Sequence, residues 1–176
     1  MNPARRPGLA VTALVLAMLA GAGQPGAAQV RGRLRAADKA CVITAVDVAF
    51  GRFDPQNTAP TDSQGSVTYV CGTHEGSRLR SVRTPVKGVR VEISSGSSGS
   101  YDRAMNAGGA RLRYNLYLDA ARQVVWGNGS GGTQVLLHDS PKNGQSYTVP
   151  IYARIYPQQD AMAGVYADNL VVTIEW

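Results

Sequence analysis

Short stretches of alternating apolar and polar residues recur along the chain, separated by segments rich in Gly, Ser, Asn and Pro. Alternation of this kind is typical of half-buried strands, and the polar segments are typical of turns. The predicted strands are VAF (48–50), SVTYVC (66–71), GVRVEIS (88–94), RLRYNLYL (111–118), TQVLLH (133–138), SYTVPIYARIY (146–156) and the closing run 164–176. The predicted separators are 54–65, SSGSSGSYD (94–102), GNGSGG (127–132) and 140–145. The spacing predicts an all-β chain folded as a Greek-key β-sandwich.

Two of these strands show which face enters the core. One predicted inward face is Val89, Val91 and Ile93, with Arg90 and Glu92 opposite; the other is Tyr147, Val149, Ile151, Ala153 and Ile155. Pro150 lies on the outward face of an apolar strand, where it cannot donate to a ladder. We therefore expect an edge position or a bulge at Pro150.

The closing strand, GVYADNLVVTIEW, alternates up to Trp176. Its period of two places Leu170, Val172, Ile174 and Trp176 on one face, and Val171, Thr173 and Glu175 on the other. A strand this apolar needs a neighbour, so the edge and groove beside it must be covered by another segment.

The first 28 residues have the features of a secretory signal peptide. Arg5 and Arg6 form a basic start, LAVTALVLAMLAGA (9–22) is a short apolar stretch, and small residues around Ala28 suit cleavage. An uncleaved anchor is the alternative, although no basic stop-transfer segment follows. The mature chain would be residues 29–176, which is one domain's worth, with no stable membrane insertion.

Charge and composition give no sign of a nucleic-acid partner. Without Arg5 and Arg6, Lys plus Arg falls from 18 to 16 against 12 acidic residues, and the net charge falls from +6 to +4. No Lys/Arg cluster is interleaved with aromatic residues, as a stacking surface for nucleic acid requires.

Cys41 and Cys71 are the only cysteines. In a secreted chain an even count most simply means one disulfide, here closing a loop of about 30 residues and adding about 3 kcal/mol of stability in the chain-entropy model. A metal site made with His74 and His138 is the alternative, but Cys41 has no nearby ligand in the sequence and the set has no spare member.

Catalysis has little support, and no cofactor is expected. His74 and His138 lie in or beside polar, turn-like stretches, where we expect them to be solvated, and no serine has a nucleophile signature. Asp119 and Arg122 suit a short turn with an aspartate cap. GNGSGG lacks the ending of a phosphate loop and is better explained as a hairpin loop. We therefore do not expect an enzyme.

Three blocks in order carry a family resemblance: CVITAVDVAFGRFDPQNTAPTDSQGSVTYVC (41–71), LRYNLYLDAARQVVWGNG (112–129) and YTVPIYARIYPQQDAMAGVYADNLVVTIEW (147–176). Together they resemble the spore coat protein U domain family, which includes subunits of archaic chaperone–usher pili. The resemblance implies an immunoglobulin-like pilin sandwich over 41–176 that lacks its final strand, with cysteines matching Cys41 and Cys71 in a disulfide. It also implies completion by donor-strand exchange, in which the N-terminal extension of one subunit pairs with the open edge of the next.

The predicted mature start, QVRGRLRAADKA (29–40), has the pattern of such a donor strand. Val30, Gly32, Leu34 and Ala36 alternate with Arg31, Arg33 and Arg35 over about 27 Å of strand. We expect this segment to cover the groove beside residues 166–176 of a neighbouring subunit, with Leu170, Val172, Ile174 and Trp176 as the acceptor edge. A basic disordered arm, or a segment that folds back on its own domain, are the two alternatives.

The resemblance further implies a periplasmic pilus chaperone that covers the groove before assembly, an outer-membrane usher, and neighbouring pilin subunits as partners. The expected function is a structural subunit of a secreted surface fibre that serves adhesion and biofilm formation. A carbohydrate- or surface-binding sandwich, with loops 94–102 and 127–132 as its site, and a spore or cell-surface coat protein are the alternatives.

Overall fold

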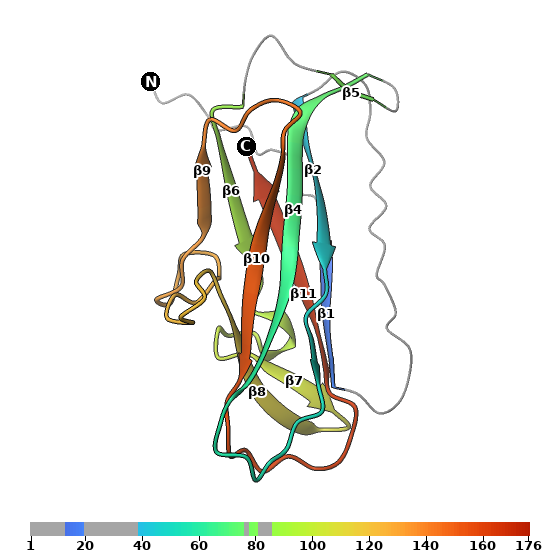
Figure 1. Cartoon of the computed structure of the whole chain (residues 1–176), viewed down its shortest axis with the longest axis vertical. Coiled ribbons are helices and arrows are strands. Elements are labelled where there is room, and N and C mark those ends of the chain that lie inside the picture. Colours follow the sequence, from blue (N-terminus) through green and yellow to red (C-terminus); the bar gives the residue numbers. More distant parts are fainter. Residues whose placement is uncertain (1–12, 20–38, 76–77, 81–85) are drawn as a thin grey trace.

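The computed structural model describes residues 13–19, 39–75, 78–80 and 86–176. Within these ranges the chain is almost entirely strand and loop, with one short 3₁₀ helix, η1 (Gly96–Ser98) (Figure 1). The strands are β1 (Ala13–Leu19), β2 (Lys39–Val46), β3 (Ala49–Gly51), β4 (Thr61–Glu75), β5 (Arg78–Arg80), β6 (Gly88–Ile93), β7 (Ala104–Ala107), β8 (Ala110–Tyr117), β9 (Leu136–Asp139), β10 (Ser146–Ile155) and β11 (Ala167–Glu175).

The strands form two facing layers. One layer contains β2, β4 and β10, with β5 beside β4. The other contains β9, β6, β11, β1 and β3. Strand β8 joins them, because its first half pairs with β7 at the start of β11 and its second half pairs with β10. This is the β-sandwich that the strand spacing predicts, in the immunoglobulin-like form that the family resemblance implies.

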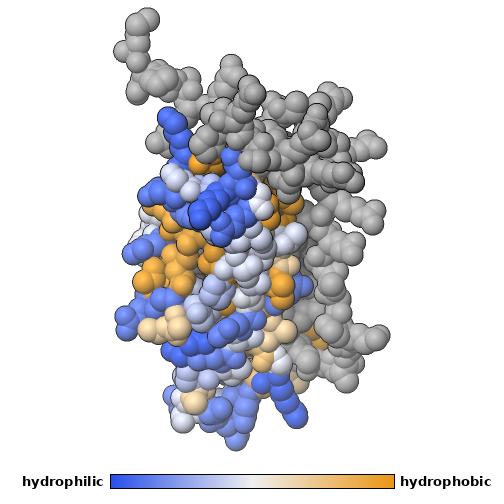
Figure 2. Space-filling model, turned by 45° about the horizontal axis from the view of Figure 1, so that its top comes forward, coloured by the Kyte–Doolittle hydropathy of each residue, from blue (hydrophilic) through white to orange (hydrophobic). Residues whose placement is uncertain are grey.

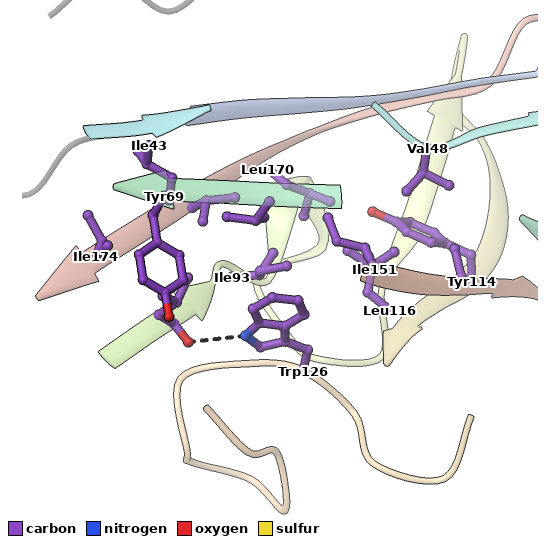
Figure 3. Close-up of a cluster of buried hydrophobic side chains, with 14 of the residues drawn as sticks. Ile43, Val48, Tyr69, Ile93, Tyr114, Leu116, Trp126, Ile151, Leu170 and Ile174 are labelled. Atoms are coloured by element: carbon purple, nitrogen blue, oxygen red, sulfur yellow. Dashed lines mark hydrogen bonds between the residues drawn. The ribbon is translucent and has the colours of Figure 1, made fainter. Parts of the chain in front are cut away.

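The predicted inward faces of β6 and β10 meet the apolar face of β11 between the layers. Val91, Ile93, Ile151, Leu170 and Ile174 are all inaccessible to solvent. Figure 3 shows Ile93, Leu170 and Ile174 of one layer packing with Ile43, Tyr69 and Ile151 of the other. Burial of each such aliphatic side chain contributes about 1.5–3 kcal/mol, so this core supplies the main stabilisation of the fold.

Cys41 and Cys71 form a disulfide between β2 and β4, as the family resemblance implies. The two residues are direct partners in the antiparallel ladder, and both are buried. The bond therefore joins neighbouring strands at the end of the sandwich where β2 begins (Figure 1).

Arg103 is a fully buried charge that holds the two layers together. Its guanidinium donates to the carbonyl oxygens of Ser94 (2.8 Å) and Trp126 (2.8 Å) and to Oδ1 of Asn115 (2.6 Å). It also lies over the ring of Tyr101, 4.9 Å from the ring centroid. Burial lowers the pKa of Arg103 from its ordinary value, and these acceptors and the negative charge of nearby Asp168 offset that cost.

Trp126, in the loop after β8, is the largest fully buried side chain. Its indole N–H donates to the carbonyl oxygen of Val91 at 3.1 Å, the dashed line in Figure 3. The loop 127–132 after it was expected to be a hairpin loop. That prediction is wrong, because Trp126 and Gln134 at its base pair in parallel.

Strand β4 starts earlier than the alternation predicts. Residues 61–65 belong to a segment predicted as a separator, yet they pair with residues 151–155 of β10. At Gly65 a Cβ would lie 2.6 Å from the carbonyl oxygen of Val46, so a side chain would push the two segments apart. The pairing partner, rather than local polarity, fixes this end of β4.

Pro150 lies at an edge, as predicted. Before Tyr152, β10 pairs with β4 on one side, and the described strands give it no partner on the other. The missing donor of Pro150 therefore costs no ladder hydrogen bond.

The surface mixes polar and apolar residues. Figure 2 shows apolar residues reaching the surface on the left, the side where Figure 1 places β6 and β9. Leu137 of β9 is 67% exposed. Single exposed residues of this kind are ordinary on a protein surface.

We predict that Arg103→Ala lowers the free energy of unfolding by about 3 kcal/mol or more, because it leaves buried carbonyl groups without donors. Arg111→Ala, at an exposed position on β8, is the matched control and should change stability by less than about 0.5 kcal/mol. Urea unfolding followed by tryptophan fluorescence measures both. Equal stability of the two variants would contradict the structural role of Arg103.

Candidate functional site

The edge of the last strand, β11, is covered by β1, which lies beside it in Figure 1. The two strands are antiparallel, with Ala13 opposite Val172, Val15 opposite Leu170 and Ala17 opposite Asp168. On its other side β11 pairs with β6. Just after β6, the N–H of Ser94 donates to the carbonyl oxygen of Val171, and the hydroxyl oxygen of Ser94 accepts from the N–H of Val171. Because N–H groups alternate along a strand, those of Leu170 and Val172 face β1.

The far side of β1 is closed by β3. Met18 pairs with Ala49 and Leu19 with Gly51, and these two strands run parallel. The described part of the chain thus contains a groove between β11 and β3 that is one strand wide. We call it the acceptor groove, and β1 occupies it.

The floor of the acceptor groove is apolar. Leu170, Val172 and Ile174 are fully buried, and Trp176 is half-buried against the same core. The predicted edge residues therefore share one face, while their role as a binding edge stays a prediction.

The predicted donor residues Val30, Gly32, Leu34 and Ala36 lie outside the described residues, as do Arg31, Arg33 and Arg35. Glu175, on the outward face of β11, contacts Arg90 at 3.3 Å.

Asp168 is the polar exception on the inward side of β11. It is 2% exposed, and its carboxylate accepts from the hydroxyl of Tyr114 (2.8 Å) and from the main-chain N–H groups of Ser97 and Asn169 (2.9 Å each). Burial, and then the negative charge of Asp168, raise the pKa of Tyr114, which keeps its hydroxyl a donor. At Gly96 a Cβ would lie 2.3 Å from this carboxylate, so only a glycine lets the main chain of η1 approach Asp168 this closely.

An open hollow lies where β1 ends. It has a volume of about 450 Å³ and is lined by Gly51, Arg52, Phe53, Pro55, Leu112 and residues 161–166. Leu19 pairs with Gly51, so the acceptor groove opens directly into it. Met162 and Val165 on its rim are 66% and 56% exposed.

A second hollow, of about 480 Å³, lies between the two loops considered as a carbohydrate site. Ser100, Tyr101 and Asp102 line one side, and Gly131, Gly132 and Thr133 line the other. The fold thus brings residues 94–102 and 127–132 together.

His138 was expected to be solvated, and this is wrong. It is half-buried on β9, and its Nδ1 shares a hydrogen bond with the hydroxyl of Tyr69 while its ring packs edge-on against Tyr147. The side chain of His74 is outside the described set. Asp119 caps a turn as predicted, since its carboxylate accepts from the N–H groups of Gln123 and Val124.

Among the described residues, no group of three or more His, Cys, Asp and Glu side chains is placed to hold a metal ion. No helix in the described ranges is long and apolar enough to cross a membrane.

The sequence reading missed Asp168 and the rim of the first hollow. Alternation carried two residues back from Leu170 does place Asp168 on the inward face, and a lone acid there is a detectable signal. The rim residues belong to a loop, and no periodic pattern marks them.

The family model described as the Spore Coat Protein U domain matches residues 26–173. The chain belongs to the Spore Coat Protein U domain family. A comparison with curated proteins found no significant match.

Two solved structures resemble this Spore Coat Protein U domain. One is a chain of the CsuC–CsuE chaperone–tip adhesion subunit pre-assembly complex from archaic chaperone-usher Csu pili of Acinetobacter baumannii. It has a TM-score of 0.51 and 24% identity, and the match covers 78% of this chain but only 40% of that one, so it shows the fold alone. The AfaE-3 adhesin from Escherichia coli matches over 96% of both chains at 15% identity, and its TM-score of 0.41 carries no argument.

We predict that a chain beginning at Lys39, which lacks both β1 and the predicted donor strand, loses hydrogen-exchange protection at the amides of Leu170 and Val172, by about tenfold or more relative to the full chain, because β1 is their partner. The amide of Val171, held by Ser94, is the internal control and should stay protected in both chains. Amide exchange measured residue by residue by NMR gives the comparison. Equal protection of Leu170 in the two chains would mean that another segment covers the edge.

Proposed function

We propose that this protein is a structural subunit of a secreted surface fibre that polymerises by donor-strand exchange. Residues 29–40 of one copy would take the place that β1 holds in the acceptor groove of the next. The observation that carries this proposal is that the edge of β11 accepts an added strand, which pairs with residues 167–172 over an apolar floor. Strand addition to a sheet edge is an established mode of recognition between chains.

The direction of β1 supplies the direction of the donor strand. A strand antiparallel to β11 enters with its first residues near Ile174 and ends near Asp168 and the first hollow. Ala17 stands opposite the tightly held Asp168, so a small donor residue is required there. Gly32 and Ala36 are the small residues of the donor pattern, and each defines one allowed register.

The pattern of the two segments supports the exchange. Val15, Ala17 and Leu19 follow each other at a spacing of two, and Val30, Gly32 and Leu34 repeat this order of branched, small and large residues. Burial of Val30 and Leu34 would contribute about 1.5–3 kcal/mol each, added to the main-chain hydrogen bonds.

An open acceptor groove would promote aggregation, so a periplasmic chaperone would cover it and an outer-membrane usher would exchange the chaperone for the next subunit. The solved relative was crystallised as a chaperone–subunit pre-assembly complex, and this supports a chaperone partner here. The expected place of the fibre is the cell surface, where it would serve adhesion and biofilm formation.

The test compares two double variants of equal charge change. Val30→Asp/Leu34→Asp should abolish the ladder of multimers that surface-sheared protein gives on an unheated SDS gel, because it puts charge on the inward face of the donor. Arg31→Ser/Arg35→Ser, with the same spacing on the outward face, should keep the ladder. A ladder that survives the first change, or a parent chain that runs only as monomer, would refute donor-strand exchange by residues 29–40.

A second candidate function is supported by the second hollow. Two polar loops converge there, with Asp102, Thr133 and Tyr101 as hydrogen-bonding groups, which suits a carbohydrate ligand. On a glycan array, binding should be lost in Asp102→Ala and kept in Asp54→Ala, at an exposed position in a different loop. A parent chain that binds no glycan would contradict this second function.

A further inference from the structure

The rim of the first hollow is an apolar surface at one end of the sandwich. Met162 and Val165 are both more than half exposed and belong to one loop, with Ala161 and Phe53 beside them around the hollow. Two of the four most exposed large apolar residues of the described chain thus lie within four positions of each other. We call Met162, Val165 and the hollow they border the distal rim.

The distal rim and the start of β2 lie at opposite ends of the molecule. In Figure 1 the loop before β11 is at the bottom, while β2 starts at the top. The disulfide, Lys142 and Lys87 belong to that upper end. The N–H of Gly144 donates to the carbonyl oxygen of Cys71 at 2.8 Å, and the N–H of Ser140 donates to the carbonyl oxygen of Lys87 at 3.0 Å. We call this the disulfide end.

The direction of the added strand decides which ends of two copies meet. A donor strand that runs as β1 does leaves the acceptor groove at the distal rim, because Leu19, the last residue of β1, pairs with Gly51 of that rim. The donor chain then continues into its own β2, which begins at Lys39 at its disulfide end. The distal rim of the acceptor therefore faces the disulfide end of the donor.

The connection between them is short. With Ala36 opposite Asp168, three residue steps lead to Lys39, at most about 10 Å. With Gly32 opposite Asp168, seven residue steps lead to Lys39, and this connection spans at most about 24 Å. That is still less than the length of the ten-residue strand β10, roughly 33 Å. In either register the two domains are held end to end.

On the basis of the proposed donor-strand exchange, we infer that the distal rim is the docking surface for the disulfide end of a second copy of this chain. The exposed Met162 and Val165 are covered by the loop that carries Lys142 in the neighbouring copy. The interface is head to tail, so each copy uses two different surfaces and the contact repeats without closing. The donor strand joins the copies, and the distal rim fixes the angle between them.

The experiment uses the full chain, produced in its own cells and sheared from the surface, with Met162→Cys combined with Lys142→Cys. A short bismaleimide should link these two positions between adjacent copies and give multimers that survive boiling. Met162→Cys combined with Leu137→Cys is the matched control, since Leu137 is as exposed as Met162 but lies on β9. The Met162/Lys142 pair should give several-fold more boiling-resistant product than the control pair.

The outcomes separate this inference from the proposed function. A normal ladder before boiling, with no more linked product than in the control, would overturn the docking surface and leave donor-strand exchange standing. A parent chain without any ladder would overturn both. Linked product that depends on Lys142→Cys, together with the ladder, supports both.

Discussion

The structure depends on hydrogen bonding along one edge of β11. The main-chain groups of Leu170 and Val172 point away from β6 and are satisfied by a strand that comes from the start of the sequence. On the inward face of β11, Leu170, Val172 and Ile174 complete the core. A row of unpaired N–H and C=O groups above an apolar floor is unstable in water, because both the hydrogen bonds and the hydrophobic surface need a cover. Whatever covers the edge therefore completes the sandwich, and the same requirement underlies the proposed assembly.

The rest of the sandwich is built to keep this groove in shape. Arg103 donates to Oδ1 of Asn115 on β8 and to the carbonyl oxygen of Trp126 in the loop after it. The indole N–H of Trp126 in turn donates to the carbonyl oxygen of Val91 on β6. Asp168 links β11 to Tyr114 on β8. These contacts join the layers by hydrogen bonds at fixed geometry, whereas aliphatic packing alone tolerates small shifts. They thus hold β11, one wall of the acceptor groove, in a fixed position relative to β8.

The sequence predicts the parts of this fold that follow from local patterns. The inward faces of β6 and β10, the edge position of Pro150, and the turn capped by Asp119 all follow from alternation or turn chemistry and are confirmed. The early start of β4 and the half-buried His138 are determined by partners far away in the chain, and no local pattern reveals them. Asp168 lies between these cases, because its inward position follows from alternation while its three donors come from the fold. The segment that pairs with β11 was predicted as part of a signal peptide, on composition that suits an apolar strand equally well.

The place of β1 has a consequence for the timing of assembly. While residues 13–19 stay attached, they compete for the groove from within the same molecule, at an effective concentration on the order of millimolar. A strand from another molecule present at micromolar concentration is outcompeted by the attached one by mass action. If the first 28 residues are removed by proteolysis, as the sequence predicts, the internal competitor is lost, and the groove becomes available to a strand from another molecule only after cleavage.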